Sequence, residues 1–564
     1  MALRIPVGID DFRKLREGGF EYIDKSHLLR EVLDAGAEVV LLPRPRRLGK
    51  SLALSMLRCF LEKRDEDLSH LFEDLSIWRA GEAYRAHYQR HPVLYLTFKG
   101  AKHDSLEACW GSIEKKLQAL FDEHRDLLGS GQLSEREAID FRAVLAGTAS
   151  RTLFERALLD LSSYLHRVHG ERVVILIDEY DEPIHAGHVN GYGKPIIDFF
   201  RAFFTEGLKG NPHLFKAVLT GILRVARESI FSGLNNLAVY SLLRNEFSTC
   251  FGFTEPEVLA LLDRAGRRDQ AELVRRWYNG YLFGKTVIYN PWSVLNFIDD
   301  PEGEPRPYWL ATSSNDLVKR LLEDRAARLE PVFEALLADE GIERVLDENV
   351  ALDQLDRSDD ALWSLLVFSG YLKAEKRPRS PMEQSAHYLT IPNREVRLLY
   401  TGTFREWMQR RMSACGGDVE RLTRALLRGD AEVFEEQLQT LAETLLSYHD
   451  GRAVRPEQLY HGFIIGLLAL LEPGHKVRSN RESGKGRPDV LILPSQPGAP
   501  GVVLELKVAR PGKKTLDQAL AEGLDQLRRR DYTAELRAAG ASPIHAFAVA
   551  FDGKHVRLKS ADEG

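Results

Sequence analysis

The strongest constraint on the fold is an alternation of short apolar runs with helical segments over residues 39–219. Each run is bounded by charged residues, which is typical of buried parallel strands joined by crossover helices. The pattern predicts an α/β sheet covered on both faces, with ligands bound beyond the carboxyl ends of the strands. The four runs are Val39–Leu42, Val93–Phe98, Val173–Ile177 and Phe215–Leu219.

A candidate phosphate-binding loop follows the first run. Residues 44–51, Arg-Pro-Arg-Arg-Leu-Gly-Lys-Ser, match the Walker A pattern in the last three positions but lack its usual first glycine. Lys50 would reach the phosphates and the Ser51 hydroxyl would bind Mg²⁺. Arg44 stands where a small residue normally allows tight backbone geometry. The three arginines of the loop could add positive charge near the anion. The residues expected to bind ATP here are Arg46, Arg47, Gly49, Lys50 and Ser51.

A second nucleotide-binding element ends the third run. Asp178 and Glu179 have the Walker B arrangement, in which the aspartate holds Mg²⁺ and the glutamate polarises the attacking water. Thr220, at the end of the fourth run, is placed to sense the γ-phosphate, and Arg224 follows where an arginine finger could act. The competing interpretations are a plain strand-end threonine and, for Arg224 and Arg227, arginines on a helix surface.

The most informative chemistry lies near the carboxyl terminus. Asp489 opens one predicted strand, and Glu505 and Lys507 lie two positions apart within the next, so the latter two side chains share a face. Adjacent strands can bring Asp489 and Glu505 together as ligands for Mg²⁺ or Mn²⁺, with Lys507 beside the activated water. This arrangement predicts phosphodiester cleavage. The competing interpretation is a lone ion pair on the solvent face of an amphipathic strand.

Basic residues surround these carboxylates. Between Glu472 and Lys514 there are nine basic and four acidic residues, and two of the acids are the candidate metal ligands themselves. Such a strip suits the phosphates of a nucleic acid. Glu457, on a preceding helix, is a further candidate catalytic carboxylate, although a solvated helix glutamate is an equal alternative. Gln526, on the following helix, is a candidate for orienting water or backbone.

Composition bounds the class of protein. The chain has 564 residues and a formal charge of −6, so any nucleic-acid surface must be local. Its four cysteines are widely spaced, which indicates reduced thiols. The amino-terminal residues lack a signal-peptide pattern, and the most apolar stretch, Phe463–Leu471, is far shorter than the roughly 18 residues of a membrane span. We therefore expect a soluble, cytoplasmic protein with no membrane partner.

Changes of pattern along the chain predict a multidomain α/β fold. A helix at Leu362–Phe368 followed by two short strands is typical of a winged helix. The last stretch predicts a helix, three strands, a helix and a final strand at Ile544–Phe551. The predicted divisions are 1–253, a P-loop ATPase-like α/β domain; 254–350, a helical lid; 351–412, a winged helix; 413–450, a helical connector; and 451–564, a restriction-endonuclease-like α/β core.

Short sequence motifs that together point to one family extend over most of the chain. They are Tyr22–Lys25, residues 44–51, Asp178–Asp181, Thr220–Gly221, Ser232–Asn236, Phe251–Thr254, Trp277–Tyr281, Ser369–Leu372, Gly484–Asp489, Glu505–Lys507 and Gln526. In combination they resemble the bacterial AAA-ATPase-like proteins fused to a PD-(D/E)xK nuclease-superfamily domain. The resemblance implies an amino-terminal P-loop ATPase and a carboxyl-terminal nuclease core that binds Mg²⁺ through Asp489 and Glu505. It also implies that the arginine-rich loop is the family's usual form.

These features predict an ATP-binding and ATP-hydrolysing protein that controls a Mg²⁺-dependent nuclease acting on nucleic acid, with DNA favoured over RNA. One alternative is a nucleotide-switched DNA-binding or signalling protein whose winged helix recognises a site while its nuclease-like domain does not cut. Another is a remodelling ATPase without nuclease function. An arginine finger supplied in trans would require a homo-oligomer, whereas one supplied in cis would not.

Overall fold

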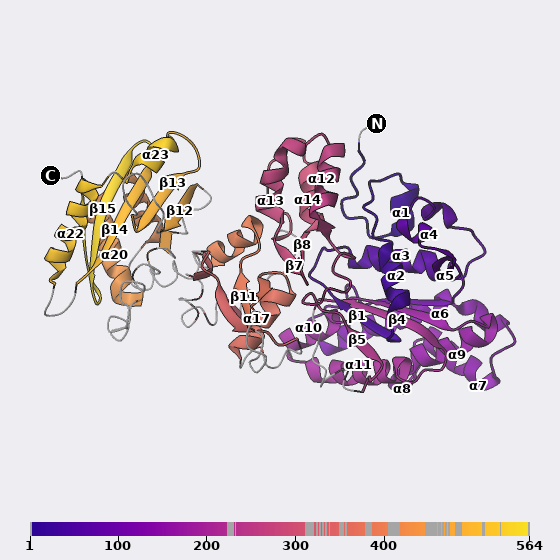
Figure 1. Ribbon diagram of the computed structural model, residues 1–564. Coiled ribbons are helices and arrows are strands. Elements are labelled where there is room, and N and C mark those ends of the chain that lie inside the picture. Colours follow the sequence, from indigo (N-terminus) through magenta and orange to yellow (C-terminus); the bar gives the residue numbers. More distant parts are fainter. Residues whose placement is uncertain are drawn as a thin grey trace. The chain divides into compact units, whose positions relative to one another are not determined.

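The computed structural model forms two compact units, each described by itself below (Figure 1). The first contains Met1–Ser314 and Glu343–Glu395, and the second contains Asn315–Ile342 and Val396–Gly564. This division is coarser than the five predicted parts, whose boundaries stay predictions. The structure describes residues 3–222, 230–231, 233–310, 339–348, 358–377, 386–403, 418–445, 474–479, 488–509, 514–530 and 532–561, with scattered residues in 318–337, at 355 and in 460–471.

A five-stranded parallel sheet forms the core of the first unit. Its strand order is β2-β3-β4-β1-β5. All four strands predicted from the apolar runs are present, whereas the short β5 was not predicted. The strands are β1 Val39–Pro43, β2 Val93–Thr97, β3 Val173–Asp178, β4 Leu214–Gly221 and β5 Leu237–Val239. Every residue of β1 and β3 is buried, as expected for central strands of a sheet covered on both faces.

Helices between the strands cover this sheet. The P-loop leads directly into α3 (Lys50–Leu61), which packs against β2, β3 and β4. In Figure 1, α3 lies on one side of the strands and α11 (Gly193–Leu208) on the other. The remaining helices of this part are α1 Phe12–Glu17, α2 His27–Asp34, α4 Ser76–Arg79, α5 Glu82–Arg85, α6 Leu106–Glu123, α7 Glu135–Leu145, α8 Arg151–Glu155, α9 Ala157–His169 and α10 Glu182–Val189.

The segment after the sheet contains strands that the sequence analysis missed. Between its helices lies a small antiparallel sheet with the order β6-β8-β7. Phe283 pairs with Thr286, so the β7–β8 hairpin turns through two residues, and the first of them, Gly284, has the positive φ of +56° that such turns favour. The elements are β6 Phe253–Thr254, α12 Glu255–Arg264, α13 Ala271–Tyr278, β7 Tyr281–Phe283, β8 Thr286–Tyr289 and α14 Pro291–Asp299.

The helix and strand pair expected in 351–412 are present. α17 (Asp359–Phe368) is followed by β10 (Lys373–Lys376) and β11 (Ala386–Thr390), which pair antiparallel, and β9 (Ile342–Val345) completes a three-stranded sheet. Every side chain of Ala361–Phe368 is buried. The helix is therefore a packing element of its unit on all sides, and the winged-helix assignment stays a prediction.

The second unit is built on a five-stranded mixed sheet in the sequential order β12-β13-β14-β15-β16. β14 and β15 are parallel and are connected through α22, which packs on both; the other pairs are antiparallel. The elements are α19 Val419–Arg428, α20 Ala431–Leu445, β12 His475–Ser479, β13 Val490–Pro494, β14 Gly501–Val508, α22 Leu516–Arg529, α23 Ala534–Ala538, β15 Ile544–Asp552 and β16 His555–Ser560.

The final strand of this unit, β16, corrects the sequence analysis, which ended the fold at β15. Asp552 pairs with His555, so the chain turns through Gly553 and Lys554, and Gly553 has a φ of +58°. A glycine at the first position of a two-residue turn between two strands is a hairpin signal, and the sequence prediction did not use it. The helix predicted to begin at Glu457 lies largely outside the described residues. None of the helices that the structure describes has the length and apolar character of a membrane span.

Candidate functional site

The carboxyl ends of β1, β3 and β4 bring three predicted side chains of the first unit together. Asp178 ends β3, and both of its carboxylate oxygens accept hydrogen bonds. Ser51 Oγ donates to Oδ2 at 2.6 Å, and Thr220 Oγ1 donates to Oδ1 at 2.6 Å. The Walker A hydroxyl and the Walker B carboxylate are therefore adjacent, which is the arrangement that a shared Mg²⁺ requires. Thr220 orients this carboxylate, whereas its predicted contact with a γ-phosphate stays a prediction.

Lys50 is placed to bind phosphates. It is buried at the start of α3, just after Gly49, whose φ is +86°. Its ammonium donates to the carbonyl oxygens of Arg44 at 3.1 Å and Pro45 at 3.0 Å. Burial lowers the pKa of Lys50, and the nearby carboxyl groups, led by Glu179, oppose that effect. Neutral carbonyl oxygens are weaker acceptors than phosphate oxygens, so the residues present fit a nucleotide.

Arg44 does not contribute charge to this site. Its guanidinium is fully buried and donates to the carbonyl oxygens of Pro43, Tyr240 and Phe247 at 2.7–3.1 Å. It also lies 5.4 Å from the ring centre of Phe251. The expectation that a small residue is needed at this position is wrong, because the arginine side chain turns away from the loop and supports it from behind.

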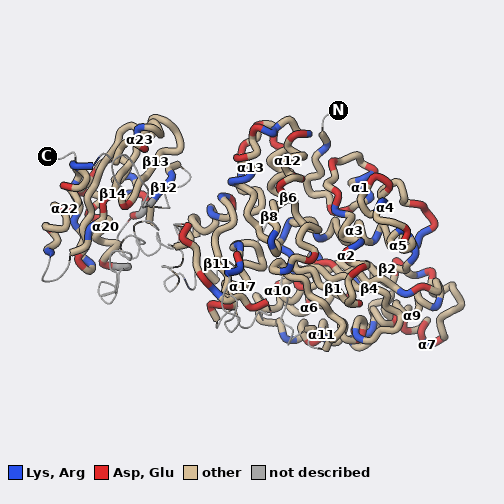
Figure 2. The backbone as a smooth tube through the Cα atoms, in the orientation of Figure 1, with Lys and Arg blue, Asp and Glu red and all other residues tan. Residues whose placement is uncertain are grey.

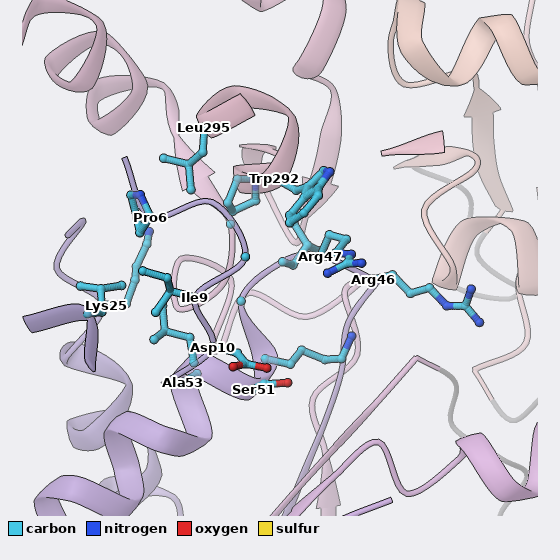
Figure 3. Close-up of a pocket in the computed structure, with 18 of the residues that line it drawn as sticks. Pro6, Ile9, Asp10, Lys25, Arg46, Arg47, Ser51, Ala53, Trp292 and Leu295 are labelled. Carbon is cyan, nitrogen blue, oxygen red and sulfur yellow. The ribbon is translucent and has the colours of Figure 1, made fainter. Parts of the chain in front are cut away.

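The other two arginines of the loop differ from each other. Arg47 has a φ of +63°, so the left-handed backbone positions of this loop are Arg47 and Gly49, two residues further on. Its guanidinium lies 4.4 Å from the ring centre of Trp292, and Figure 3 shows this stacking. Arg46 also lines the cavity, but in Figure 3 its side chain extends away from the apolar residues. The predicted finger Arg224, with Arg227, lies outside the described residues.

Glu179 has the properties of a proton acceptor. Its φ of +51° is unusual for a residue other than glycine, and such backbone conformations concentrate at functional sites. Burial, followed by the neighbouring Asp178 carboxyl, raises the pKa of Glu179 to about 7, while Lys50 opposes the shift. A carboxylate with this pKa suits general-base work near neutral pH.

A cavity of about 460 Å³ opens beside the P-loop (Figure 3). Its volume lies within the usual range for small-molecule sites. Many residues of the cavity wall were not predicted, because they come from distant segments of the chain without a recognisable motif. One of them is His185, whose pKa burial lowers to about 3 with help from the Arg46 charge. The wall residues that were not predicted include Pro6–Asp10, Lys99, Lys102, His185, Trp292 and Leu295.

The second unit gathers the predicted carboxylates and lysine. Asp489 precedes β13, and its Oδ2 accepts a hydrogen bond from the backbone N–H of Leu506 on β14 at 2.8 Å. Lys507 Nζ donates to Glu505 Oε1 at 2.7 Å. The Glu505 side chain is only 1% exposed, so the alternative of an ion pair on a solvent face is wrong.

Glu505 is suited to hold a metal ion. Its Oε2 is buried and has no hydrogen-bond partner among the described residues. Burial, followed by the Asp489 carboxyl, raises the pKa of Glu505 to about 7, while Lys507 opposes the shift. An orphaned carboxylate oxygen beside a second carboxylate is costly without a cation, so this donor set fits Mg²⁺ or Mn²⁺.

Comparisons with known proteins assign two regions of the chain to known families. Residues 6–231 match the family model described as a predicted AAA-ATPase, and residues 455–561 match that of the PD-(D/E)XK nuclease superfamily. The chain joins an AAA-ATPase-like domain to a PD-(D/E)XK nuclease-superfamily domain. The chain is also similar over nearly its full length to "Uncharacterized protein in vnfD 5'region" from Azotobacter chroococcum mcd 1, which is 28% identical over 555 residues, covering 97% of this chain and 96% of the relative.

The remaining predictions for the nuclease-like domain have different outcomes. Gln526 lies on α22, and its Nε2 donates to the Tyr532 hydroxyl at 2.8 Å instead of contacting the carboxylates. One turn earlier, Gly523 brings the helix against Lys507, since an added Cβ would lie 3.4 Å from Lys507 Cγ. Glu457 lies outside the described residues. Gln526 is therefore next to the site, and its role in catalysis stays a prediction.

Proposed function

We propose that this protein is a nuclease that cleaves DNA with Mg²⁺ and is controlled by ATP at its AAA-ATPase-like domain. The observation that carries the proposal is the buried Glu505, whose second oxygen lacks a hydrogen-bond partner among the described residues while Asp489 and Lys507 lie beside it. Each group is one that phosphodiester hydrolysis needs. The fused ATPase-like domain supplies a second place where phosphate chemistry is expected.

At the nuclease-like site, Asp489 and Glu505 would hold the metal ion. When bound, the ion would polarise the phosphate and lower the pKa of a water molecule. The chain's own contribution is positional. The backbone of Leu506 fixes the Asp489 carboxylate, and Lys507 is held against Glu505 Oε1, where its ammonium can orient the nucleophile.

At the nucleotide site, Lys50 would bind the phosphates, while Ser51 and Asp178 would hold Mg²⁺. Glu179 lies at the end of β3 next to Asp178, where it can accept a proton from the attacking water. Arg47 and Trp292 form one wall of the cavity beside this loop. ATP is therefore the ligand that we propose for the cavity.

Basic side chains support DNA as the substrate. Lys476 and Arg478 lie on β12, the edge strand beside β13, and lysines and arginines of this unit are blue in Figure 2. Arg528 and Arg529 lie at the end of α22. Positive charge on the elements next to a candidate cleavage site suits a phosphate backbone.

The alternative of a non-cleaving DNA-binding switch depends on a winged helix that recognises DNA. The helix in the expected position, α17, is buried over Ala361–Phe368, so it has no free face to place in a groove. This observation favours cleavage over site recognition.

The test is cleavage of labelled double-stranded DNA, single-stranded DNA and RNA by the full chain with Mg²⁺ or Mn²⁺. We expect Glu505→Gln to lose DNA cleavage by at least 100-fold, since removal of one carboxylate ligand weakens the metal site. Glu522→Gln is the matched control, because Glu522 lies on α22 and pairs with Lys514 outside the carboxylate pair. Equal cleavage by wild type and Glu505→Gln would overturn the proposal, and cleavage of RNA alone would change the substrate.

A further inference from the structure

A further group of metal-type ligands lies beside the P-loop cavity and contains none of the side chains proposed to bind phosphate or Mg²⁺. His27 and Glu31 are one turn apart on α2, so their side chains share a face of that helix. Cys250 comes from a segment 219 residues further along the chain and is buried. One ligand atom from each residue lies within 4.8 Å of the others.

We propose that His27, Glu31 and Cys250 bind one divalent transition-metal ion of the zinc type. An imidazole nitrogen, a carboxylate oxygen and a thiolate sulfur are the three ligand classes that Zn²⁺ uses in proteins, and three protein ligands leave a fourth position for water. Mg²⁺ and Ca²⁺ do not suit this set, because they prefer oxygen ligands. The proposed site shares no ligand residue with the nucleotide and nuclease sites, although Cys250 also lines the cavity beside the P-loop.

Hydrogen bonds already gather these ligands. Glu31 Oε2 accepts from the backbone N–H of Phe247 at 2.6 Å, and Cys250 Sγ donates to Glu31 Oε1 at 3.3 Å. His27 Nε2 lies 3.2 Å from Thr249 Oγ1. Tetrahedral Zn²⁺, with bonds of about 2.0–2.3 Å, places its ligand atoms about 3.3–3.5 Å apart. A closure of roughly 1 Å by side-chain rotation would therefore complete the site.

The protonation states are compatible with a metal ion. Burial lowers the pKa of His27, which keeps the imidazole in its neutral, ligating form. Burial, followed by the Glu31 carboxylate, raises the pKa of the Cys250 thiol. Metal binding would therefore break the S–H bond, form the metal–sulfur bond and release the proton to solvent. Thiolate and carboxylate together neutralise the charge of a divalent ion.

Two cations lie close to the cluster, and each has two opposing effects on metal binding. Arg44 is buried next to the segment of Cys250, and Lys25 Nζ donates to the backbone oxygen of Thr249 at 2.9 Å and also pairs with Glu257. Their charges favour the thiolate form of the cysteine but oppose the approach of a metal ion. The bound ion would connect α2 to the segment that encloses Arg44, behind the P-loop.

The experiment uses the full chain carrying Glu505→Gln, so that the nuclease site does not contribute. After chelator treatment, the protein is titrated with Co²⁺ and then Zn²⁺. We expect one equivalent of Co²⁺ with a thiolate-to-cobalt charge-transfer absorption that Zn²⁺ abolishes. Cys250→Ser should remove the absorption, and His27→Gln should weaken Co²⁺ binding at least tenfold. Cys59→Ser is the matched control, because Cys59 is another buried cysteine outside the cluster, on α3.

Near-ultraviolet circular dichroism establishes that each variant is folded. If Cys250→Ser does not fold, the spectrum of the starting protein and the Co²⁺ affinity of His27→Gln still decide the question, because His27 is only half-buried. No charge-transfer absorption in the folded starting protein would overturn the proposal, as would absorption unchanged in Cys250→Ser or binding unchanged in His27→Gln. Any of these three results would leave the cluster as a thiol–carboxylate hydrogen bond that holds α2 in place.

Discussion

The ammonium of Lys50 is the group on which we expect the proposed nucleotide binding to depend most. In the structure it donates to two carbonyl oxygens of the P-loop. With ATP bound, the ammonium would donate to phosphate oxygens, and hydrogen bonds to charged groups contribute about 1.5–3 kcal/mol each, so losing two of them would cost about 3–6 kcal/mol of binding free energy. We therefore expect Lys50→Met to weaken ATP binding at least 100-fold, as measured by calorimetric titration of the full chain.

Lys216 provides the matched control for this substitution. It is also buried, and its ammonium also donates to two carbonyl oxygens, those of Ala35 at 2.8 Å and Ala37 at 2.9 Å. It lies near the start of β4, at the opposite end of the strand from Thr220. Lys216→Met should lower the thermal stability and leave the ATP affinity unchanged. Equal loss of affinity in both variants would mean that Lys50 acts only through stability.

His91 makes the stability of the first unit depend on pH. Its Nδ1 donates to the Arg172 carbonyl at 3.1 Å, so in the neutral ring Nε2 accepts from His87 Nδ1 at 3.0 Å. Burial lowers the pKa of His91 from 6.5 to about 4. Below pH 6.5 the unfolded chain binds a proton here that the folded chain does not, so stability falls as the pH decreases from 6.5 to 4.

The expected contribution of His91 to that loss is about 3 kcal/mol, at 1.36 kcal/mol for each pKa unit. His91→Gln removes the titrating group, so its free energy of unfolding should change less between pH 7 and pH 4 than that of the wild type. Calorimetric unfolding at several pH values measures the difference. His70→Gln, at an exposed histidine, should keep the wild-type pH dependence. Identical pH dependence in wild type and His91→Gln would contradict the assignment.

At the scale of elements, the P-loop is supported by segments that follow the main sheet. Trp309 Nε1 donates to the Arg46 carbonyl at 3.3 Å, and Arg47 stacks on Trp292 of α14. Gly370, directly after α17, packs against the loop so closely that an added Cβ would lie 3.0 Å from Pro45 Cβ. The last contact gives the glycine motif at 369–372 a structural role beside the P-loop.

Gly370→Ala tests this support. Gly370 has a φ of +90°, and its Cβ would also lie 3.1 Å from the Tyr281 ring, so the substitution strains the backbone and displaces the loop. We expect ATP affinity to fall about tenfold. Gly266→Ala is the control: its φ is +67° and no atom lies within 4 Å, so it should lower stability by about 1 kcal/mol and leave ATP affinity unchanged. Equal ATP affinity in both variants would contradict the contact.

The strands that could be predicted from the sequence are those whose side chains are mostly buried. β1 to β4 were predicted because their apolar runs are buried between helices, and β13 to β15 were predicted for the same reason. β5, β7 and β8 have only three or four residues, too few to show a period of hydrophobicity. β16 alternates buried with exposed residues after a two-residue turn that begins at Gly553, and neither signal was used.

The residues of the candidate sites also fall into two groups: those that could be predicted from the sequence and those that only tertiary contacts bring together. Asp178, Glu505 and Lys507 could be found because charged residues within or at the end of apolar strands are costly without a function. The structural role of Arg44 could not be found, because its acceptors Tyr240 and Phe247 are about two hundred positions away. The cluster of His27, Glu31 and Cys250 has no motif either, since tertiary contacts alone bring α2 to that cysteine.

At the scale of the whole molecule, the two units are connected by the chain itself. Glu395 is the last residue of one part of the first unit, and the second unit resumes at Val396. The buried carboxylate of Glu395 accepts hydrogen bonds from Ser293 Oγ at 2.8 Å and from the backbone N–H of Trp309 at 2.6 Å. Trp309 in turn contacts the P-loop. A change at the nucleotide site therefore has a hydrogen-bonded route to the point where the chain enters the second unit.

The most direct test of ATP control is the rate of DNA cleavage with and without ATP for wild type, Lys50→Met and Glu505→Gln, with ATP hydrolysis followed in parallel. We predict that ATP changes the cleavage rate of the wild type at least fivefold and does not change that of Lys50→Met. Glu505→Gln should still hydrolyse ATP while failing to cleave. Cleavage by the wild type that is the same with and without ATP, and the same as that of Lys50→Met, would contradict control of the nuclease by the ATPase-like domain.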